Sequence, residues 1–551
     1  MTQLIHGLHF KNIRGDIYGG VTAAVVALPL ALAFGVASGA GAIAGLYGAI
    51  IVGFFAALFG GTPSQVSGPT GPMTVVMTAI IIDYVGKYPD TGLAIAFTVV
   101  VLGGLIQILM GVLKLGRYIN FVPFPVLSGF MSGIGVIIII LQLAPLVGHE
   151  TTKEGILAAF QNLPGLLSSP ILDATILGVI TLVIVWFWPP RLNKLFPSQL
   201  LALIVGTAIY LLFLKGGDAK ILGDIPTGIP AFHMPTFNMD LFADMIKSAL
   251  VLATLGAIDS LLTSLVADNK TRSHHDSDRE LIGQGIGNTI AGLFWGLPGA
   301  GATMRTVVNI RAGGQTPISG ALHSLLLLAI VLGAASLAQY IPHAVLAGIL
   351  IKVGVDIIDW DYLKRIGRAP RMDLLIMLAV MLITVFVDLI TAVGVGVVAA
   401  SLILVQRLTN LQLEQVNLIT EPGEEAPLSE EEAEIMKELK GQVLLFHLSG
   451  PISFGAAKGM TRELSGIEEY KIMLLDMSDV HMIDTTSCKA IEDIIHDQLA
   501  TDREIYLIGF DDDVYDVLDR MDVLRPLDKS HVVWSRIEAL RAAKLKLQAE
   551  K

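Results

Sequence analysis

The turn Ser67-Gly68-Pro69-Thr70-Gly71-Pro72-Met73-Thr74 interrupts a long apolar region of the chain. Pro72 suits the first turn of a helix, where its missing N–H loses no hydrogen bond. A helix that begins inside a membrane leaves its first N–H groups unpaired and carries about half a positive charge at that end. Lipid cannot satisfy these donors, but an anion can. The turn therefore predicts an anion site within the membrane; the alternative is an ordinary Gly/Pro loop at the membrane surface.

A second turn of the same kind is Pro298-Gly299-Ala300-Gly301-Ala302-Thr303-Met304-Arg305. Thr303 and the amides beside it are candidates for anion binding, and the Thr303 hydroxyl is also a candidate cation ligand. Arg305 either supplies a positive charge to the site or lies on its far side and holds the scaffold. The alternative explanation of the glycines is close packing of helices, which is common in membranes.

Asp259 lies inside a predicted membrane helix, in the sequence Leu255-Gly256-Ala257-Ile258-Asp259-Ser260-Leu261-Leu262-Thr263. A carboxylate at that depth costs roughly 2.5–3.5 kcal/mol on insertion, so such residues usually have a function. Thr263 is four residues further on and shares the helix face of Asp259. A carboxylate, a hydroxyl and nearby carbonyl groups suit sodium. The alternatives are a proton-carrying carboxyl and a structural partner for Arg305.

The composition indicates a membrane protein with a soluble end. Of the 551 residues, 53% are hydrophobic and 16% charged, against about 25% charged in soluble proteins. We predict 14 membrane segments: 17–37, 43–60, 70–85, 92–113, 124–146, 171–188, 198–214, 242–264, 283–297, 303–312, 318–340, 343–358, 372–388 and 390–407. The short segments 70–85 and 303–312 each stand third in a set of seven, which indicates an inverted repeat around a central site.

Charges in the loops predict the orientation. Alternate loops are rich in Lys and Arg: Lys114 and Arg117; Arg191 and Lys194; Lys270, Arg272 and Arg279; Lys364, Arg365, Arg368 and Arg371. The positive-inside rule then places both termini in the cytoplasm. We expect a cytoplasmic N-terminus (1–16), a transport domain (17–407), an acidic linker (408–440) and a cytoplasmic domain (441–551). The net charge of −12 does not indicate nucleic-acid binding, and the lone Cys488 excludes an intrachain disulfide.

The C-terminal domain alternates strand and helix patterns. We predict strands at 443–448, 471–477 and 505–510, with helices around 455–466 and 487–499, which is typical of a small α/β domain. Asp484 and Thr485 precede the second helix, where they either cap it or accept a phosphate. The sequence contains no nucleotide-binding Gly-rich motif and no catalytic triad, so we expect neither an enzyme nor a cofactor.

Several motifs together resemble the sulfate permease (SulP) family of anion transporters. They are 27–34 (Ala-Leu-Pro-Leu-Ala-Leu-Ala-Phe), 44–48 (Ala-Gly-Leu-Tyr-Gly), 68–71 (Gly-Pro-Thr-Gly), 278–288 (Asp-Arg-Glu-Leu-Ile-Gly-Gln-Gly-Ile-Gly-Asn) and 304–309 (Met-Arg-Thr-Val-Val-Asn). The C-terminal domain resembles STAS, a domain shared with anti-sigma-factor antagonists. The resemblance implies an all-α membrane domain of seven plus seven segments, in which a core moves against a gate, and a homodimer joined partly through STAS.

Within the family the resemblance is closest to sodium-dependent bicarbonate transporters of cyanobacteria, on 35–41, 70–78 and the Asp259 helix. It implies sodium ligands at Asp259, Thr263, Gly301, Ala302 and Thr303. It also implies anion binding near Thr70, Gly71, Ala302 and Thr303. Two family positions differ: Leu30 replaces a common Gln, and Phe34 replaces Tyr, which disfavours a doubly charged anion. Thr485 occupies the place where STAS antagonists carry a phosphorylated Ser.

These observations predict a sodium-coupled importer of bicarbonate in a bacterial plasma membrane, with Na⁺ as the coupling ion and no transition metal. One alternative is proton-coupled or exchange transport of sulfate or a dicarboxylate. Another is an anion channel, or a membrane receptor that signals through STAS.

Overall fold

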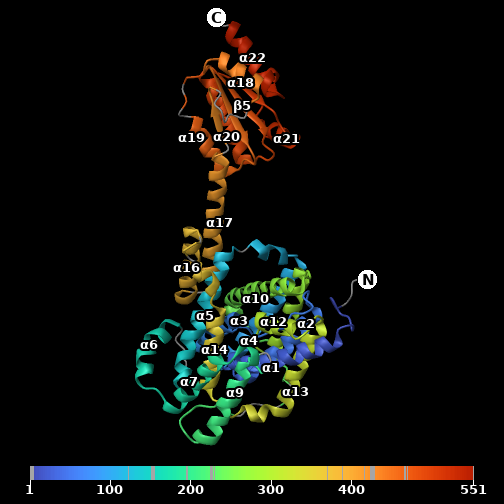
Figure 1. Ribbon diagram of the computed structural model, residues 1–551, viewed down its shortest axis with the longest axis vertical. Helices are drawn as coiled ribbons and strands as arrows, with labels where there is room; N and C mark the ends of the chain where they lie inside the picture. Colours follow the sequence, from blue (N-terminus) through green and yellow to red (C-terminus); the bar gives the residue numbers. More distant parts are fainter. Residues whose placement is uncertain are drawn as a thin grey trace. The chain divides into compact units, whose positions relative to one another are not determined.

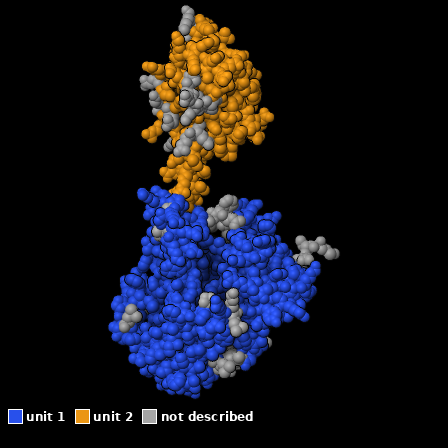
Figure 2. Space-filling view, viewed as in Figure 1, with its two compact units in different colours: residues 1–398 blue, residues 399–551 orange. Residues whose placement is uncertain are grey.

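The computed structural model describes residues 5–549 except 122, 151–155, 194–195, 224–227, 229, 366, 369, 388, 415, 422–427, 465–466 and 468. The chain forms two compact units, Met1–Val398 and Ala399–Lys551 (Figure 2). The boundary between them falls within helix α17 (Leu389–Glu414).

Unit 1 is helical (Figure 1). The helices that correspond to the 14 predicted segments are α1 (Ile13–Ala37), α2 (Ala42–Phe59), α3 (Gly71–Lys87), α4 (Gly92–Val112), α5 (Phe124–Leu146), α7 (Leu172–Phe187), α9 (Ser198–Ile209) with the π-turn η2 (Tyr210–Leu214), α10 (Phe242–Thr271), α11 (Ser277–Leu293), α12 (Thr303–Arg311), α13 (Pro317–Ala338), α14 (His343–Ile357), α16 (Arg371–Phe386) and α17. The short helices are η1 (Gly116–Phe121), α6 (Ile156–Ser168), α8 (Pro190–Asn193), η3 (Met239–Leu241) and α15 (Trp360–Lys364). Among the described residues, six helices are long and apolar enough to cross a membrane.

The helices of unit 1 pack as two groups. Helices α1–α4 and α10–α13 mainly contact one another, and we call this group the core. Helices α5, α7, α9, α14 and α16 mainly contact one another, and we call them the gate. The two groups meet where α1 packs on α9 and α14, and where α3 packs on α5. The predicted division into core and gate is confirmed at this level.

Glycines bring α4 and α11 together inside the core. A Cβ atom on Gly285 of α11 would lie 2.6 Å from the carbonyl oxygen of Gly104. A Cβ atom on Gly104 of α4 would lie 2.4 Å from the backbone nitrogen of Thr289. The two backbones therefore touch, which is how membrane helices obtain close packing without a hydrophobic driving force between them.

We expect Gly285→Val to force these helices apart and to destabilise the core by about 1–3 kcal/mol, the usual cost of overpacking. Gly394→Ala on α17 is the matched control, because no heavy atom lies within 4 Å of the added methyl group. The melting temperature of the detergent-solubilised protein should fall for Gly285→Val alone. Equal melting temperatures for the two variants would show that α4 and α11 can accommodate a larger side chain at this contact.

Unit 2 is a five-stranded sheet with helices on both faces (Figure 1). The strand order is β3 (Asn417–Ile419), β4 (Val443–Ser449), β5 (Ile472–Asp479), β6 (Glu504–Ile508) and β7 (Val532–Val533), and all neighbours are parallel except β3 with β4. Leu444 and Phe446 pack into one buried cluster, whereas Val443 and Leu445 pack into another. Because successive side chains of a strand face opposite sides, the sheet is buried on both faces.

The helices of unit 2 are α18 (Glu430–Glu438), α19 (Phe454–Leu464), α20 (Thr485–Ala500), α21 (Asp512–Arg520), η4 (Lys529–His531) and α22 (Arg536–Ala549). The stretch 408–440, which we expected to be a linker, contributes the strand β3 and the helix α18 to this unit. Strand β3 pairs with β4, and α18 packs on α22 behind a capping box formed by Ser429 and Glu432. Glu424 and Glu425, two acidic residues of the same stretch, lie outside the described residues.

A buried charge cluster joins β4, β5 and α22. Asp476 is fully buried and accepts hydrogen bonds from His447 Nδ1 at 2.8 Å and from Arg536 Nε at 2.8 Å. The Ser478 hydroxyl donates a third at 2.6 Å. Burial alone raises the pKa of Asp476, but the hydrogen bonds from His447 and Ser478 and the charge of Arg536 bring its pKa below the ordinary value. The carboxylate therefore holds three parts of the unit together while it is ionised.

Because the folded-state pKa of Asp476 is lowered, its contribution to stability is present above the unfolded pKa, about 3.9, and is lost as the pH falls through the folded pKa. We expect Asp476→Asn to cost about 3 kcal/mol at pH 7, since it removes the buried negative charge that faces Arg536, which also contacts Glu432 at 3.6 Å. Hydrogen exchange of β5 and α22 in the full-length protein should show this loss, and the difference from wild type should shrink below a pH of about 4. The exposed Asp516→Asn is the control. A difference that persists unchanged in acid would contradict the ion-pair account.

Candidate functional site

The two turns that the sequence singles out lie against each other. Each contains a two-residue strand, β1 (Ser67–Gly68) and β2 (Ala300–Gly301), and the strands pair antiparallel. The ladder continues where the backbone nitrogen of Ala302 donates to the carbonyl of Val66 at 3.0 Å. Helices α3 and α12 begin directly after these strands, so the pairing fixes both helix starts relative to each other.

Glycine is required where the two strands meet. A Cβ atom on Gly299 would lie 2.5 Å from the carbonyl carbon of Gly68, which is closer than real Cβ contacts come. Gly68 itself has a φ of +149°, in a region that favours glycine. The glycines of both turns therefore allow the two backbones to approach closely, whether or not a ligand also binds there.

The N-termini of α3 and α12 have no side-chain cap. The residues that precede them, Thr70 and Ala302, form no capping hydrogen bond. The first N–H groups of each helix therefore remain available, and each helix end carries about half a positive charge. Thr70, Gly71 and Ala302 are buried, whereas Thr303 is exposed. The pair of helix ends can hold an anion without a full counter-charge.

Asp259 joins the predicted cation site to this pair of helix ends. It lies on α10 with 6% of its surface exposed, and its Oδ2 accepts a hydrogen bond from the Thr70 hydroxyl at 2.7 Å. Thr70 immediately precedes α3. The carboxylate thus lies one residue from the start of the helix that is predicted to bind the anion.

Three further oxygen atoms gather one helical turn away. The Thr263 hydroxyl donates to the carbonyl of Gly301 at 2.9 Å and lies 2.7 Å from the hydroxyl of Thr303. Asp259, Thr263, Gly301 and Thr303 therefore offer a carboxylate, two hydroxyls and a carbonyl, which are the hard oxygen ligands that suit an alkali cation. Ala302 lies between Gly301 and Thr303. Its N–H already donates to the carbonyl of Val66, so Ala302 contributes by positioning its neighbours and not through its own N–H.

Asp259 differs from the other buried acids in how well it is satisfied. Glu280 accepts from the backbone of Gly61 and Thr62 and from the side chains of Gln65 and Gln284. Asp16 accepts from both backbone and side-chain groups of Thr316 and from the backbone of Gln315. Among the described residues, the structure shows a single donor to Asp259. A buried carboxylate needs several donors or a cation. The buried guanidinium of Arg305 supplies positive charge near Asp259, and a bound cation would be a second source of it.

Arg305 lies on α12 and holds the first turn. It is 2% exposed and donates through Nη2 to the carbonyl of Pro69, while its Nη1 is buried without a partner among the described residues. This contact connects the start of α12 to the turn that precedes α3. The position fits a scaffold role, and the charge of the guanidinium also adds to the positive potential of the two helix ends.

The gate covers the start of α3 with two isoleucines. A Cβ atom on Gly71 would lie 2.7 Å from Ile357 Cδ1 of α14 and 2.9 Å from Ile138 Cδ1 of α5. A cavity of about 20 Å³ remains beside them, lined among others by Phe34, Gly71 and Thr74. That volume is enough for about one water molecule. Passage of an ion therefore requires the core and gate to separate here.

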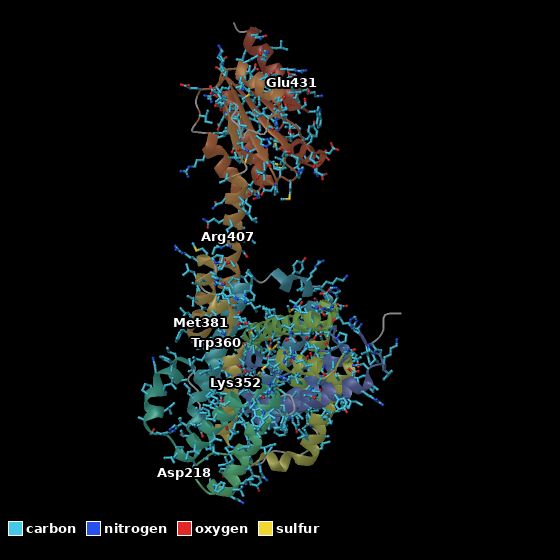
Figure 3. All side chains as sticks on the ribbon, in the orientation of Figure 1. Asp218, Lys352, Trp360, Met381, Arg407 and Glu431 are labelled. Carbon is cyan, nitrogen blue, oxygen red and sulfur yellow. The ribbon has the colours of Figure 1, made fainter. Side chains whose placement is uncertain are left out.

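Sequence reasoning missed an ion pair within the gate. Lys352 and Asp356 pair on α14, four residues apart, and Lys352 is labelled in Figure 3. The sequence does contain a sign of this pair, because two ionisable residues are four positions apart in the apolar segment 343–358. The network of Glu280 with Gln65 and Gln284 was also missed. Glu280 and Gln284 are at helical spacing, but Gln65 is 215 positions from Glu280, and only the fold brings it to them.

Thr485 is the first residue of α20 in unit 2 and is exposed. The preceding Asp484 caps the helix by accepting from the backbone nitrogen of Ser487 at 2.8 Å. Thr485 is therefore accessible to a modifying enzyme, whereas Ser487 is fully buried.

Comparison with known proteins agrees with this architecture. Residues 13–380 match the sulfate permease family, and residues 434–532 match the STAS domain. The chain is 50% identical over 545 residues to the bicarbonate transporter BicA of Synechocystis sp., which covers 99% of this chain and 97% of that protein.

Two solved structures are also similar. The transmembrane domain of a cyanobacterium bicarbonate transporter BicA matches with 55% identity and a TM-score of 0.67, over 71% of this chain and all of that one. Murine Solute Carrier 26 family member A9 matches in fold, with 19% identity and a TM-score of 0.83 over 98% of this chain and 92% of that one. The helical unit with paired turns, the α/β unit and these matches lead to one conclusion: the chain is an integral membrane protein of the sulfate permease family with a C-terminal STAS domain.

Proposed function

We propose that the protein imports bicarbonate together with sodium by alternating access, as a symporter and not as an enzyme. The observation that carries the proposal is the hydrogen bond between Thr70 and Asp259, which joins the cation ligands to the helix start that binds the anion. The identity of 50% to a protein named as a bicarbonate transporter supports bicarbonate as the anion. Leu30 and Phe34 on α1 are both buried and apolar, which suits a small monovalent anion better than a doubly charged one.

The two ions would stabilise each other. Without sodium, the ionised Asp259 repels an anion at the neighbouring start of α3. A sodium ion on Asp259, Thr263, Gly301, Ala302 and Thr303 cancels that charge, so the anion at Thr70, Gly71, Ala302 and Thr303 binds more tightly. Linkage requires the reverse effect of equal size, and such couplings are typically about 5- to 150-fold in affinity.

We infer that the core carries the site and the gate blocks it. Movement of the core past Ile138 and Ile357 would expose the starts of α3 and α12 to one side of the membrane at a time. The loops rich in Lys and Arg support an orientation with both termini in the cytoplasm of a bacterium and unit 1 in the plasma membrane. A homodimer, partly joined through STAS, would keep the gate fixed while the core moves.

Asp259→Asn should abolish the dependence of uptake on sodium, because it removes the only charged cation ligand proposed. In proteoliposomes with labelled bicarbonate, wild-type uptake should rise at least about fivefold with an inward sodium gradient, and the variant should show no rise. Asp244→Asn is the control, because Asp244 is an exposed acid on the same helix. Parallel assays with sulfate and fumarate test the choice of anion.

Three results would contradict this proposal in different ways. Sodium-stimulated uptake in Asp259→Asn would remove the cation assignment. Wild-type uptake that continues when choline replaces sodium would indicate proton-coupled or exchange transport. Conductance far above carrier turnover would indicate a channel, and ligand binding without flux a receptor.

We also propose Thr485 as a regulatory phosphorylation site. A phosphate at the first residue of α20 gains from the helix dipole but lies beside the Asp484 carboxylate, so it should alter this surface of unit 2. Phosphopeptide analysis of the protein from cells at high and low inorganic carbon should find phosphate on Thr485, and none on buried Ser487. Thr485→Ala should remove that signal. Its absence from wild type in both conditions would rule the site out.

A further inference from the structure

A large cavity lies between the core and the gate, at the ends of α1, α3 and α5. Its volume is about 800 Å³, far more than a small inorganic anion needs. The wall formed by α1, α3 and α4 carries no charged side chain: it comprises Val36–Gly39, Thr78, Ile81, Ile82, Val85, Gly86, Pro89 and Leu93. The charged or titratable residues among the described lining residues are all on the opposite wall, at His149, Glu150, Lys220 and His343.

The cavity leads toward the proposed anion site. It shares Ala37, Thr78 and Gln142 with the small cavity that reaches Gly71. An ion that crosses the large cavity therefore meets the start of α3 next. With both termini in the cytoplasm, the C-terminal ends of α1, α3 and α5 lie at the outer face of the membrane, so this cavity would be the outer vestibule.

Lys220 is the only lysine or arginine among the described residues that line the large cavity, and its backbone is fixed in place. Its carbonyl accepts from the backbone nitrogen of His343 at 3.0 Å, and Leu222 donates to the carbonyl of Ile341 at 3.0 Å. The loop is thereby held on the start of α14. The ammonium of Lys220 lies 2.6 Å from a carboxylate oxygen of Glu150, and the two side chains are 49% and 76% exposed.

The exposure decides what this ion pair can do. An exposed pair is worth about 0–1 kcal/mol, because water solvates both partners well. A passing anion can therefore compete with Glu150 for the ammonium. A buried pair could not be opened at so small a cost.

We propose that Lys220, with His343 beside it, forms an outer capture site for the transported monovalent oxyanion, and that Glu150 competes with the anion for Lys220. This inference rests on the proposed function for its ligand and its orientation. Capture at the gate wall raises the local concentration of the anion at the vestibule before the core binds it. The site would change how often the anion reaches the vestibule and would leave the movement of the core unaffected.

Opposite effects of the two partners test the proposal. We expect Lys220→Gln to raise the KM for external bicarbonate by up to about fivefold, the effect of about 1 kcal/mol, with Vmax unchanged. Glu150→Gln should lower the KM, since it frees the ammonium and removes a repelling charge. The double variant should resemble Lys220→Gln. Initial rates should be measured in intact cells that lack other bicarbonate transporters, because the vestibule then faces the medium. Added salt should reduce both effects, because it screens the charges.

A pair on α10 supplies the control. Lys247 and Asp244 are 3.2 Å apart and similarly exposed, but they do not line the cavity. Lys247→Gln and Asp244→Asn should leave the KM unchanged. A KM that shifts in the same direction for Lys220→Gln and Glu150→Gln, or a change in Vmax alone, would show a structural ion pair and overturn the capture site. Absence of sodium-dependent bicarbonate uptake in wild-type cells would instead overturn the proposed function, and the ligand of the capture site with it.

Discussion

A helix that begins inside a membrane leaves backbone donors that lipid cannot satisfy, and the rest of unit 1 is arranged around this constraint. Two such helices, α3 and α12, start side by side because the short strands before them share hydrogen bonds. Where the two strands meet, only glycine fits at Gly299. The Asn288 side chain donates to the Gly299 carbonyl at 2.9 Å and accepts from its backbone nitrogen at 2.8 Å. Much of the polar interior of the core thus serves to hold two helix ends at a fixed separation.

The buried acids of the protein show how differently a carboxylate can be used. Glu280, Asp16 and Asp476 are each surrounded by donors or a cation, and each connects segments that are far apart in sequence. In the part of the chain that the structure describes, Asp259 accepts one hydrogen bond, from Thr70. A carboxylate with many donors adds rigidity, whereas one with few donors in the same environment depends more on nearby positive charge, here that of Arg305. The distinction depends on partners, so the side-chain type alone does not reveal it.

Much of this arrangement is readable in the sequence because its causes are local. Apolar length marks the spans, Gly and Pro mark the two interrupted helices, and helical spacing places Thr263 beneath Asp259. The bond from Thr70 to Asp259 joins residues 189 positions apart, and only the folded chain brings them together. Strand β3 has three residues, too few for a visible alternation, and it gains its order from β4. The amphipathic helix α6 was missed because its apolar residues do not form a run long enough to span a membrane.

The pairing of β1 with β2 has a mechanical consequence. Gly301, whose carbonyl faces the proposed sodium position, belongs to the same hydrogen-bonded ladder as the turn that positions Thr70 for the anion. The proposed ligands at the starts of α3 and α12 are therefore joined through one backbone ladder, and the two half-helices are held together. A change in the position of one half-helix is therefore passed to the other through backbone hydrogen bonds, which no side-chain substitution removes directly.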